Sequence, residues 1–391
     1  MRLARRVQDL AESATLAVTA AAAQMRADGI DVISLGAGEP DFDTPANIQE
    51  AAAAALAAGK TKYSKPAAGT LEARKAVCEK LLRDNELAYT PEQVIITAGG
   101  KMAIYLAMCA VLDPGDEVII PAPYWVSYPE IAKLMGAVPL TVTGSVGNDY
   151  KLTPQDLYPV LSARTKLFLL NSPSNPSGVT YSPDELRAIA GVLQERDLLV
   201  LSDEIYERLV FDGQESVSYA ALDERAYRQT LTVNSASKTY AMTGWRVGYA
   251  AGPVEVIRAM HKLQSQSTSG AVTFNQDALI EALTGDQSRV NEMRLAFQQQ
   301  VGYMYKRLVD MPGVRCPRPT GAFYCFPDVA GAYSRLRVAG SLEFADALLR
   351  EARVAVVPGK AFGLDNHVRV SSATSMENIV EGLNRIEAFL G

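Results

Sequence analysis

The fold is decided by residues 166–206, KLFLLNSPSNPSGVTYSPDELRAIAGVLQERDLLVLSDEIY, in which two short apolar runs flank a helix-length segment. The runs, 166–170 and 198–201, are predicted strands. The segment between them, 182–195, opens with Ser-Pro and carries two acidic residues in its first turn, which is the signature of a helix start. Strand, helix and strand in this order predict a parallel pair of strands joined by a helix.

The same alternation continues on both sides of this stretch, from about residue 44 to residue 252. Two further helix-length stretches, 101–112 and 124–135, lie between apolar runs. The remaining predicted strands are 93–97, 117–120, 138–142, 229–233 and 247–250. Regular alternation of strands and helices predicts an α/β fold with a mostly parallel sheet covered by helices on both faces.

The alternation ends at a long helical region, 253–307, and a different pattern follows. The expected elements are a strand-rich stretch 314–327, a helix 341–351, short strands 354–357 and 367–371, and a closing helix 376–389. These elements predict a smaller α/β domain, against which we expect the alanine-rich N-terminal helix, 17–25, to fold. A chain of 391 residues fits a large domain, 44–285, and a small domain made of 1–43 and 286–391.

Composition and charge exclude several classes of protein. The net charge is −6, and the lysines and arginines are scattered, so we expect no nucleic-acid partner. Residues 1–9 contain three arginines, but no apolar core of signal-peptide length follows them. The N-terminal alanine-rich stretch is interrupted by polar residues and is not a membrane span. We therefore expect a cytoplasmic protein that does not bind membranes.

The cysteines and histidines narrow the chemistry further. The four cysteines are widely spaced among apolar residues and are expected to be buried free thiols. Only two histidines are present, His261 in a charged stretch and His367 at the start of an apolar one, and neither lies in a motif. We expect no metal site, and lysine becomes the leading candidate for an acid–base group.

Polar side chains follow several predicted strands at the point where each strand ends. They are Ala98-Gly99-Gly100-Lys101, the segment 171–178 that contains Asn175, Asp203 with Tyr206, and Asn234-Ser235-Ala236-Ser237-Lys238. Ligands of open parallel sheets bind beyond the carboxyl ends of the strands. The sequence therefore predicts a site at this edge of the sheet.

Two groups at this edge suggest an anionic ligand with a cationic part. The pair Gly99-Gly100 before a helix leaves backbone N–H groups directed at an anion, and Ser235 and Arg246 could clamp a phosphate close to Lys238. Asp203 follows four apolar residues, where a carboxylate needs a partner. It is either a helix N-cap or the counter-ion of a buried cation such as a protonated pyridine nitrogen.

At this point the sequence resembles the class I aminotransferases of the aspartate aminotransferase family, essentially from end to end. The segments that carry the resemblance are LGAGEPDFDTP, KYSKPAAGT, TAGGK, PYWVSYPE, NSPSNPSG, SDEIYE, SASKTYAMTGWRVGY, PTGAFY and HVRVSSA, in this order. The resemblance implies a fold-type I pyridoxal-phosphate-dependent transferase, and it is strongest to a bacterial subgroup that transaminates aspartate and, in some members, prephenate.

Carried over to this chain, the resemblance implies a role for each motif residue. Lys238 would bind pyridoxal 5'-phosphate as a Schiff base and move the proton at the substrate Cα. The residues that would contact the ring are Asp203 at the pyridine nitrogen, Tyr206 and Asn175 at the phenolic oxygen, and Trp125 stacked on its face. The phosphate ligands would be Gly99, Gly100, Ser235, Ser237 and Arg246, with Tyr63 reaching in from the second subunit of a homodimer. Arg369 would grip the substrate α-carboxylate, helped by Asn175 and the backbone at Gly38.

The substrate expected from the resemblance is a dicarboxylic amino acid. Lys101 would bind the distal carboxylate, and Ser13 and Thr15 would close over it; otherwise Lys101 is an exposed lysine at a helix start. Prephenate-active members often carry a basic residue before this segment, whereas this chain has Ala11 and Glu12. We expect a ping-pong transfer from L-aspartate to 2-oxoglutarate that yields oxaloacetate and L-glutamate.

Three alternatives stay open at this stage. The first is an aminotransferase for prephenate or aromatic amino acids. The second is a lyase of the same fold that releases ammonia and a keto acid without an acceptor, since fold alone does not settle function. The third, a non-catalytic sensor domain of a transcription regulator, would need a DNA-binding module, for which the roughly 35 residues before Leu35 leave no room.

Overall fold

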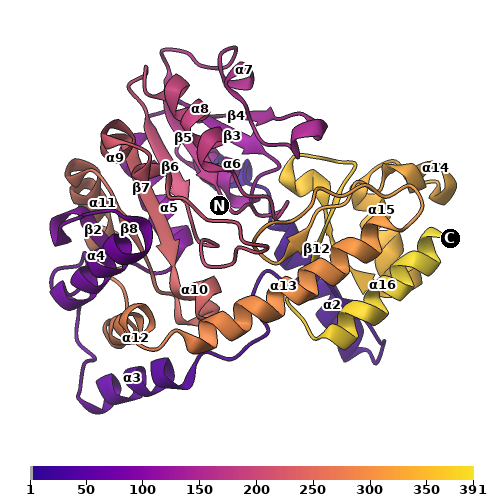
Figure 1. Ribbon diagram of the computed structural model, residues 1–391, viewed down its shortest axis with the longest axis horizontal. Helices are drawn as coiled ribbons and strands as arrows, with labels where there is room; N and C mark the ends of the chain where they lie inside the picture. The colour runs from indigo at the N-terminus through magenta and orange to yellow at the C-terminus, as the bar shows by residue number, and fades with distance from the viewer. Residues whose placement is uncertain (1–2) are drawn as a thin grey trace.

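A seven-stranded sheet forms the centre of the larger part of the protein (Figure 1). The computed structural model describes residues 3–391. The strand order is β2-β8-β7-β6-β5-β3-β4, and β8 alone runs antiparallel to its neighbours. The strands are β2 (Val94–Thr97), β3 (Glu117–Ala122), β4 (Val138–Thr143), β5 (Thr165–Asn171), β6 (Leu199–Asp203), β7 (Thr230–Ser235) and β8 (Gly248–Ala251). The predicted parallel sheet is confirmed, and each strand lies within two residues of its predicted bounds.

Both faces of this sheet are buried, because successive side chains of a strand point to opposite faces. Leu167 and Leu169 pack with one set of helices, whereas Phe168 and Leu170 pack with another. The helices of the first face are α5 (Gly100–Val111), α6 (Ser127–Leu134) and α11 (Val254–Ser267). Those of the second face include α4 (Leu71–Asn85), α8 (Pro183–Leu193), α9 (Glu224–Gln229) and α12 (Thr273–Thr284), and α3 (Ala46–Ala57) packs on α12. The near-continuous apolar runs of the strands follow from this double cover.

The helix predicted at 182–195 begins at the Ser-Pro pair, as its sequence indicates. The Ser182 hydroxyl accepts a hydrogen bond from the Glu185 backbone N–H at 3.3 Å. The Glu185 carboxylate in turn accepts from the Ser182 N–H at 2.8 Å, which completes a capping box. The box fixes the entry of α8 and brings the chain back beside β5 as the parallel strand β6.

A smaller antiparallel sheet lies beside the first one, and its strands come from the C-terminal third of the chain. Its order is β11-β12-β9, and the pair β1 with β10 lies next to it. These strands are β1 (Ile33–Ser34), β9 (Tyr324–Cys325), β10 (Val354–Ala355), β11 (Val357–Pro358) and β12 (Val368–Ser371). The surrounding helices are α2 (Ala14–Ala27), α13 (Ser288–Val309), α14 (Tyr333–Leu336), α15 (Ser341–Ala347) and α16 (Met376–Leu390). As predicted, the N-terminal helix α2 folds here, because Ala22 packs with Val32 and Ala355.

The C-terminal part also shows where the sequence was misread. The predicted helical region 253–307 is three helices, interrupted near Gly270, which has a φ of +118°, and near Gly285. The predicted strand-rich stretch 314–327 forms the two-residue strand β9 and isolated β-bridges at Arg315 and Gly321, since Pro317 and Pro319 cannot donate hydrogen bonds to a sheet. The predicted helix 341–351 is α15 followed by a π-helical turn, Leu348–Ala352.

A single hydrophobic core joins the two sheets. Leu209, which follows β6, packs in the same cluster as Phe297 on α13 and Phe323 beside β9. Helix α13 runs from α12 across to the smaller sheet (Figure 1). The division into domains 44–285 and 1–43 with 286–391 stays a prediction, and residues 1 and 2 lie outside the described residues.

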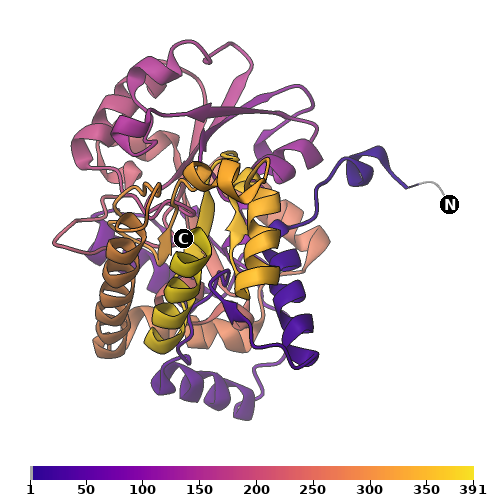
Figure 2. The same ribbon diagram turned by 90° about the vertical axis from the view of Figure 1, so that its right-hand side faces the viewer.

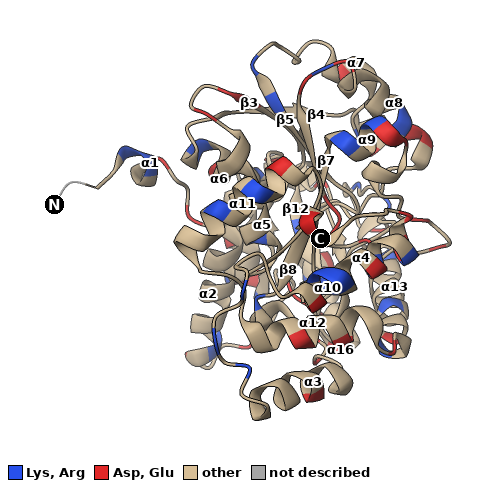
Figure 3. Cartoon of the chain, turned by 90° about the vertical axis from the view of Figure 1, so that its left-hand side faces the viewer, with Lys and Arg blue, Asp and Glu red and all other residues tan. Residues whose placement is uncertain are grey.

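The surface of the protein carries charges of both signs. In the view of Figure 3, basic and acidic residues are spread over the helices without a field of one sign. Helix α1 (Arg5–Gln8) stands away from the body of the protein (Figure 2). Between residues 3 and 391 there is no helix that is both long enough and apolar enough to span a membrane.

A buried polar network holds α4 against the ends of β6 and β7. Lys80 on α4 donates to the Glu207 carboxylate and, at 2.7 Å, to Asn85 Oδ1. Glu207 also accepts from the side-chain amides of Asn85 and Asn234, each at 2.7 Å. All four side chains are buried, so every charge and amide depends on the others for solvation.

We predict that Lys80→Ala lowers the free energy of unfolding by about 3–5 kcal/mol, because it leaves Glu207 buried without its cationic partner. Urea denaturation followed by circular dichroism measures this change. The exposed pair Arg187–Asp184, with a separation of 2.6 Å, provides the control. Arg187→Ala should cost less than about 1 kcal/mol. Equal losses in the two variants would contradict the prediction.

Candidate active site

A cavity of about 420 Å³ lies at the carboxyl ends of β5, β6 and β7 and extends to the smaller sheet. Thirteen of the sixteen predicted site residues line it: Ser13, Thr15, Gly38, Gly100, Lys101, Trp125, Asn175, Asp203, Tyr206, Ser237, Lys238, Arg246 and Arg369. Gly99, Ser235 and Tyr63 are not among the lining residues. The volume is that of a small-molecule site.

Lys238 reaches into the cavity from the short helix α10 (Ala236–Thr239), which begins directly after β7. Its amine donates a hydrogen bond to the backbone carbonyl of Gly38 and lies 5.8 Å from the centre of the Phe323 ring. Burial and, next, the positive charge of Arg369 lower the pKa of Lys238 to about 8. A large share of the amine is therefore neutral, and nucleophilic, at slightly alkaline pH.

Asp203, the last residue of β6, is a buried carboxylate without an ion pair to any residue from 3 to 391. Its two oxygens accept hydrogen bonds from the Tyr128 hydroxyl at 2.6 Å and from the Ile205 N–H at 3.3 Å. Burial raises the pKa of Asp203 to about 6, although the bond from Tyr128 opposes this change. A carboxylate held this way favours a cationic ligand.

Arg246 and the Gly99 turn form a cradle for an anion. Gly99 has a φ of +88°, and a Cβ at this position would lie 2.6 Å from Arg246 Nη2, so only glycine fits. Arg246 donates to the carbonyl of Thr243 at 2.7 Å and to that of Ala98 at 3.3 Å. No carboxylate within the described part of the chain pairs with it. The cradle therefore presents a positive charge and the N-terminus of α5 to the cavity.

Two serines complete the cradle from β7. The Ser235 hydroxyl caps α10 by accepting from the Ser237 N–H at 3.1 Å, and the two hydroxyls lie 2.8 Å apart. Ser235 Oγ also contacts the Val247 carbonyl at 2.9 Å. Ser235 thus supports the cradle from behind, whereas Ser237 and Arg246 face the cavity.

Arg369 on β12 is the buried cation of the smaller sheet. It donates to Asn175 Oδ1 at 3.0 Å and to the Gly36 carbonyl at 2.9 Å, and its Nε has no partner. Its guanidinium lies 4.5 Å from the centre of the Tyr324 ring and 5.1 Å from that of Phe362. No acidic side chain of residues 3–391 pairs with it. A buried guanidinium with open donors is suited to a carboxylate ligand.

Lys101 is a third cation that lines the cavity. The Lys101 amine lies 4.8 Å above the Trp125 ring, a cation–π contact that directs this side chain. Burial, followed by the charge of Arg246, lowers the pKa of Lys101. Ser13 and Thr15, at the start of α2, line the same cavity. The predicted cation and hydroxyls thus line one cavity, although Lys101 is also exposed in the first turn of α5, as the alternative expects, and its role in substrate binding stays a prediction.

The structure also shows site residues that the sequence reasoning did not assign. Tyr128 binds Asp203, Asn171 Nδ2 donates to the Asp203 carbonyl at 3.0 Å, and Tyr324 shares a hydrogen bond of 3.0 Å with the Tyr206 hydroxyl. Asn171 could have been found as the polar residue that ends an apolar run. Tyr128 and Tyr324 lie in motifs that resemble the family, but their contacts span 75 and 118 residues.

Tyr63 does not line the cavity of this chain. Its side chain is 78% exposed. The expectation that it reaches a site from a second subunit is not tested within a single chain.

The sequence matches the family model described as aminotransferase class I and II over residues 30–386. The chain belongs to this aminotransferase family. The aminotransferase is 47% identical over 388 residues to an aspartate aminotransferase of Bacillus sp. (strain YM-2), with 99% of each chain covered. It is 48% identical over 383 residues to an aspartate/prephenate aminotransferase of Cereibacter sphaeroides, with 96% of each covered.

Solved structures confirm the predicted fold of the aminotransferase. The aspartate aminotransferase of Thermus thermophilus with maleate superposes with a TM-score of 0.93 at 45% identity. The superposition covers 99% of this chain and 100% of the other. Both the resemblance given by the motifs and the predicted α/β transferase fold are therefore confirmed.

In protein freed of small molecules, we predict that Lys238 is acylated with a pH midpoint near 8, because its lowered pKa leaves the amine neutral above that pH. Trace labelling with acetic anhydride between pH 6 and 11, followed by peptide mass spectrometry, measures the midpoint. The exposed Lys166 in the same digest reports the rate of an unhindered amine. Arg369→Met should move the Lys238 midpoint upward, since it removes a repelling cation. A midpoint near the ordinary lysine value of about 10.4 would contradict the assignment.

Proposed function

We propose that this aminotransferase binds pyridoxal 5'-phosphate and transfers the amino group of L-aspartate to 2-oxoglutarate. One observation carries the proposal. The weakly basic amine of Lys238 shares a cavity with the unpaired carboxylate of Asp203, a cradle for an anion at Arg246, and the unpaired guanidinium of Arg369. Lys238 would meet an aldehyde, and Asp203 would meet a cationic ring nitrogen. Arg246 would meet a phosphate, and Arg369 would meet a substrate carboxylate.

The residues present fit the cofactor. The cradle of Gly99, Gly100, Ser237 and Arg246 would hold its phosphate, with Ser235 supporting the cradle from behind. Asp203, fixed by Tyr128, would keep the ring nitrogen protonated, because a buried carboxylate favours a cationic neighbour. Trp125 would cover the ring, with Tyr206 and Asn175 near its phenolic oxygen. When bound, pyridoxal phosphate supplies the aldehyde carbon and a ring that accepts electrons.

The remaining steps belong to the side chains of this chain. Arg369, together with Asn175 and the backbone at Gly38, would orient the α-carboxylate of the substrate with a planar pair of donors. Lys238, with its pKa lowered to about 8, would take the proton from the substrate Cα and return it. Because the Gly38 carbonyl accepts from Lys238 in this structure, the amine already points to the segment beside the carboxylate site.

The preference for a dicarboxylic substrate is assigned to Lys101. Its amine is held over Trp125, and Ser13 and Thr15 line the same cavity, so a distal carboxylate would have one cation and two hydroxyls available to it. The Thermus thermophilus relative was solved with maleate, which is a dicarboxylate. The donor and the acceptor would use the same site in turn, in a ping-pong reaction that forms oxaloacetate and L-glutamate.

Prephenate is the second candidate substrate, favoured by the relative from Cereibacter sphaeroides. The segment before Ser13 argues against it. Ala11 and Glu12 stand where a basic residue was expected, and the Ala11 N–H donates to the Glu130 carboxylate at 2.9 Å. Residues 11 and 12 therefore offer no basic side chain to the second carboxylate of prephenate. Turnover of aromatic amino acids or elimination without an acceptor would replace the aspartate assignment.

A homodimer in the cytoplasm, with the predicted division into two domains, completes the proposal. Tyr63 and Val272 are exposed apolar residues, and their segments are adjacent because Thr273 Oγ1 donates to the Lys62 carbonyl at 2.6 Å. An apolar face of this kind suits a subunit contact. All four cysteines are free thiols, as expected in a reducing compartment, although only Cys325 is fully buried and the prediction of burial was wrong for the others.

A half-reaction tests the proposed function. The purified protein is mixed with one amino acid and no acceptor, and the absorption of the bound cofactor is followed. We expect conversion from the aldehyde form to the amine form with aspartate and with glutamate, and hardly any with alanine. Conversion with alanine at the rate seen with aspartate would contradict the dicarboxylate assignment, whereas a colourless protein that takes up no cofactor would contradict the cofactor itself.

We predict that Lys101→Ala lowers kcat/KM for aspartate by about 10- to 100-fold, the value of one charge-assisted hydrogen bond of roughly 1.5–3 kcal/mol. For alanine, kcat/KM should change by less than about threefold, because alanine has no distal carboxylate to lose. Lys75→Ala, at an exposed position of α4, is the matched control and should leave both values unchanged. Steady-state rates with 2-oxoglutarate measure the two constants. Parallel losses for both substrates would assign Lys101 to the cofactor instead.

A further inference from the structure

Tyr150, in the loop that follows β4, has a backbone conformation that its side chain disfavours. Its φ is +63°, and the preceding Asp149 has a φ of +50°. A bulky residue in the left-handed region is uncommon and persists only where surrounding contacts hold it. The contacts of Tyr150 therefore require an explanation.

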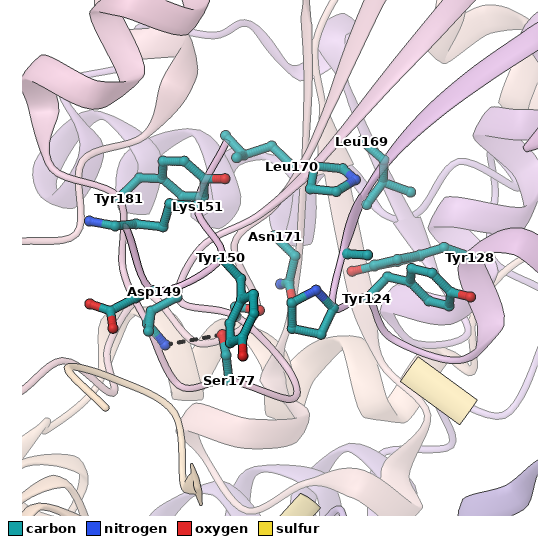
Figure 4. A pocket seen from close by; sticks show the side chains of 15 residues that line it. Tyr124, Tyr128, Asp149, Tyr150, Lys151, Leu169, Leu170, Asn171, Ser177 and Tyr181 are labelled. Atoms are coloured by element: carbon teal, nitrogen blue, oxygen red, sulfur yellow. Dashed lines mark hydrogen bonds between the residues drawn. The ribbon is translucent and has the colours of Figure 1, made fainter. Parts of the chain in front are cut away.

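The hydroxyl of Tyr150 reaches across to the smaller sheet. It lies 2.8 Å from Nε2 of His367, and the two rings meet edge to face with their centres 5.2 Å apart. Figure 4 shows the ring of Tyr150 beside Ser177 in a small cavity of about 30 Å³. Asn171 and Tyr128 line this cavity and the active-site cavity as well. Tyr150 thus stands directly behind the wall of the active site.

The direction of the hydrogen bond follows from the other partners of His367. Asn366 Nδ2 donates to the Asp328 carboxylate at 3.0 Å, which leaves Asn366 Oδ1 to accept from His367 Nδ1 at 2.9 Å. Burial lowers the pKa of His367 to about 4 and raises that of Tyr150 to about 12, so the imidazole is neutral and the phenol is protonated near pH 7. His367 Nε2 therefore accepts from the Tyr150 hydroxyl.

His367 is connected to Arg369 through a layer of aromatic rings. It stacks on Phe326 with ring centres 4.7 Å apart, and Phe326 meets Phe362 edge to face at 5.7 Å. Arg369 lies over Phe362 at 5.1 Å. His367 and Arg369 are two residues apart at β12, and alternate residues of a strand share one face. The imidazole, the two phenylalanine rings and the guanidinium thus form one continuous layer of contacts.

Both ends of the aromatic layer are held by loops of the seven-stranded sheet. The Tyr124 N–H, one residue before Trp125, donates to the Phe362 carbonyl at 3.1 Å. At the other end, His367 receives the Tyr150 hydroxyl. The layer also packs against Ala14 and Val126. These two residues adjoin Ser13 and Trp125 at the active-site cavity.

We propose that Tyr150 is a positioning residue for substrate binding: its hydroxyl fixes His367 and thereby the aromatic layer that places the guanidinium of Arg369. The inference rests on the proposed role of Arg369 as the site of the substrate α-carboxylate. Tyr150 contacts neither substrate nor cofactor in this assignment. Its effect falls on carboxylate binding and not on the phosphate cradle, which belongs to other strands.

The test compares Tyr150→Phe with the wild-type holoenzyme. Phenylalanine keeps the ring and the backbone conformation and removes only the hydroxyl. We expect the Kd for maleate, measured by calorimetry, to rise by roughly three- to tenfold, the effect of one lost hydrogen bond. KM should rise by the same factor for aspartate and for alanine, while kcat and the dissociation of the cofactor stay within twofold. Tyr158→Phe, at a side chain that is 60% exposed, should change none of these values.

A second variant separates positioning from general stability. Asparagine tolerates the left-handed region better than tyrosine does, so Tyr150→Asn relieves the backbone while it removes the hydroxyl. Tyr150→Asn also removes a ring that is only 7% exposed, so its Tm should fall below that of Tyr150→Phe. Because both variants lack the hydroxyl, we expect Tyr150→Asn to weaken maleate binding by no more than about threefold beyond Tyr150→Phe. Maleate affinity that falls in proportion to the Tm would overturn the inference.

The remaining outcomes are equally distinct. Wild-type affinity for maleate in Tyr150→Phe overturns the role of Tyr150 and leaves the proposed function intact. If Tyr150→Phe weakens only the binding of the cofactor, the inference is overturned as well, because Tyr150 would then support the phosphate cradle and not Arg369. If the wild-type holoenzyme itself neither binds maleate nor converts with aspartate, the proposed function fails and this inference fails with it.

Discussion

The geometry of the active site depends on the hydrogen bonds that the buried carboxylate of Glu207 accepts. This carboxylate accepts from Lys80, Asn85 and Asn234, so one buried charge joins α4 to the ends of β6 and β7. Glu207 directly follows Tyr206, and the Asn234 side chain accepts from the Ser235 N–H at 2.7 Å. The groups proposed for the two ends of the cofactor are therefore placed by the same network. Rigid support of this kind behind a site is what pre-organisation requires.

The charged side chains inside the cavity differ from the Glu207 network, because they have no oppositely charged partners. Arg246 and Arg369 donate to carbonyl and amide oxygens, and Asp203 is neutralised by no cation of the described chain. Arg246 is exposed, but Asp203 and Arg369 are buried, and burying unpaired charges costs stability that proteins give up mainly at functional sites. The satisfied network and the unsatisfied cavity lie a few residues apart along β6 and β7. The paired residues around Glu207 thus stabilise the fold, and the unpaired charges in the cavity stay available to a ligand.

Much of this arrangement could be predicted from local sequence, and the failures have a physical cause. Seven apolar runs predicted seven strands, and the polar residues that end them, such as Asp203 and Lys238, predicted one edge of the sheet. Local pattern could not show that the Tyr128 hydroxyl binds Asp203, since only folding brings them together. It misread 314–327, where apolar residues suggested strands and prolines prevented them. Asn175 was assigned by resemblance both to the phenolic oxygen and to the carboxylate site of Arg369; its side chain bonds Arg369 in the structure, and its contact with the cofactor stays a prediction.

The site takes its two halves from different sheets, and residues 36–38 connect them. The Gly36 carbonyl accepts from Arg369 on the smaller sheet, and the Gly38 carbonyl accepts from Lys238 after β7. Leu35, just before them, donates from its N–H to the Ala355 carbonyl at 2.9 Å, so the segment is anchored beside β10. Backbone carbonyls are weak competitors for these cations compared with a carboxylate or an aldehyde carbon. A ligand can therefore displace these carbonyls from Lys238 and Arg369 at little cost.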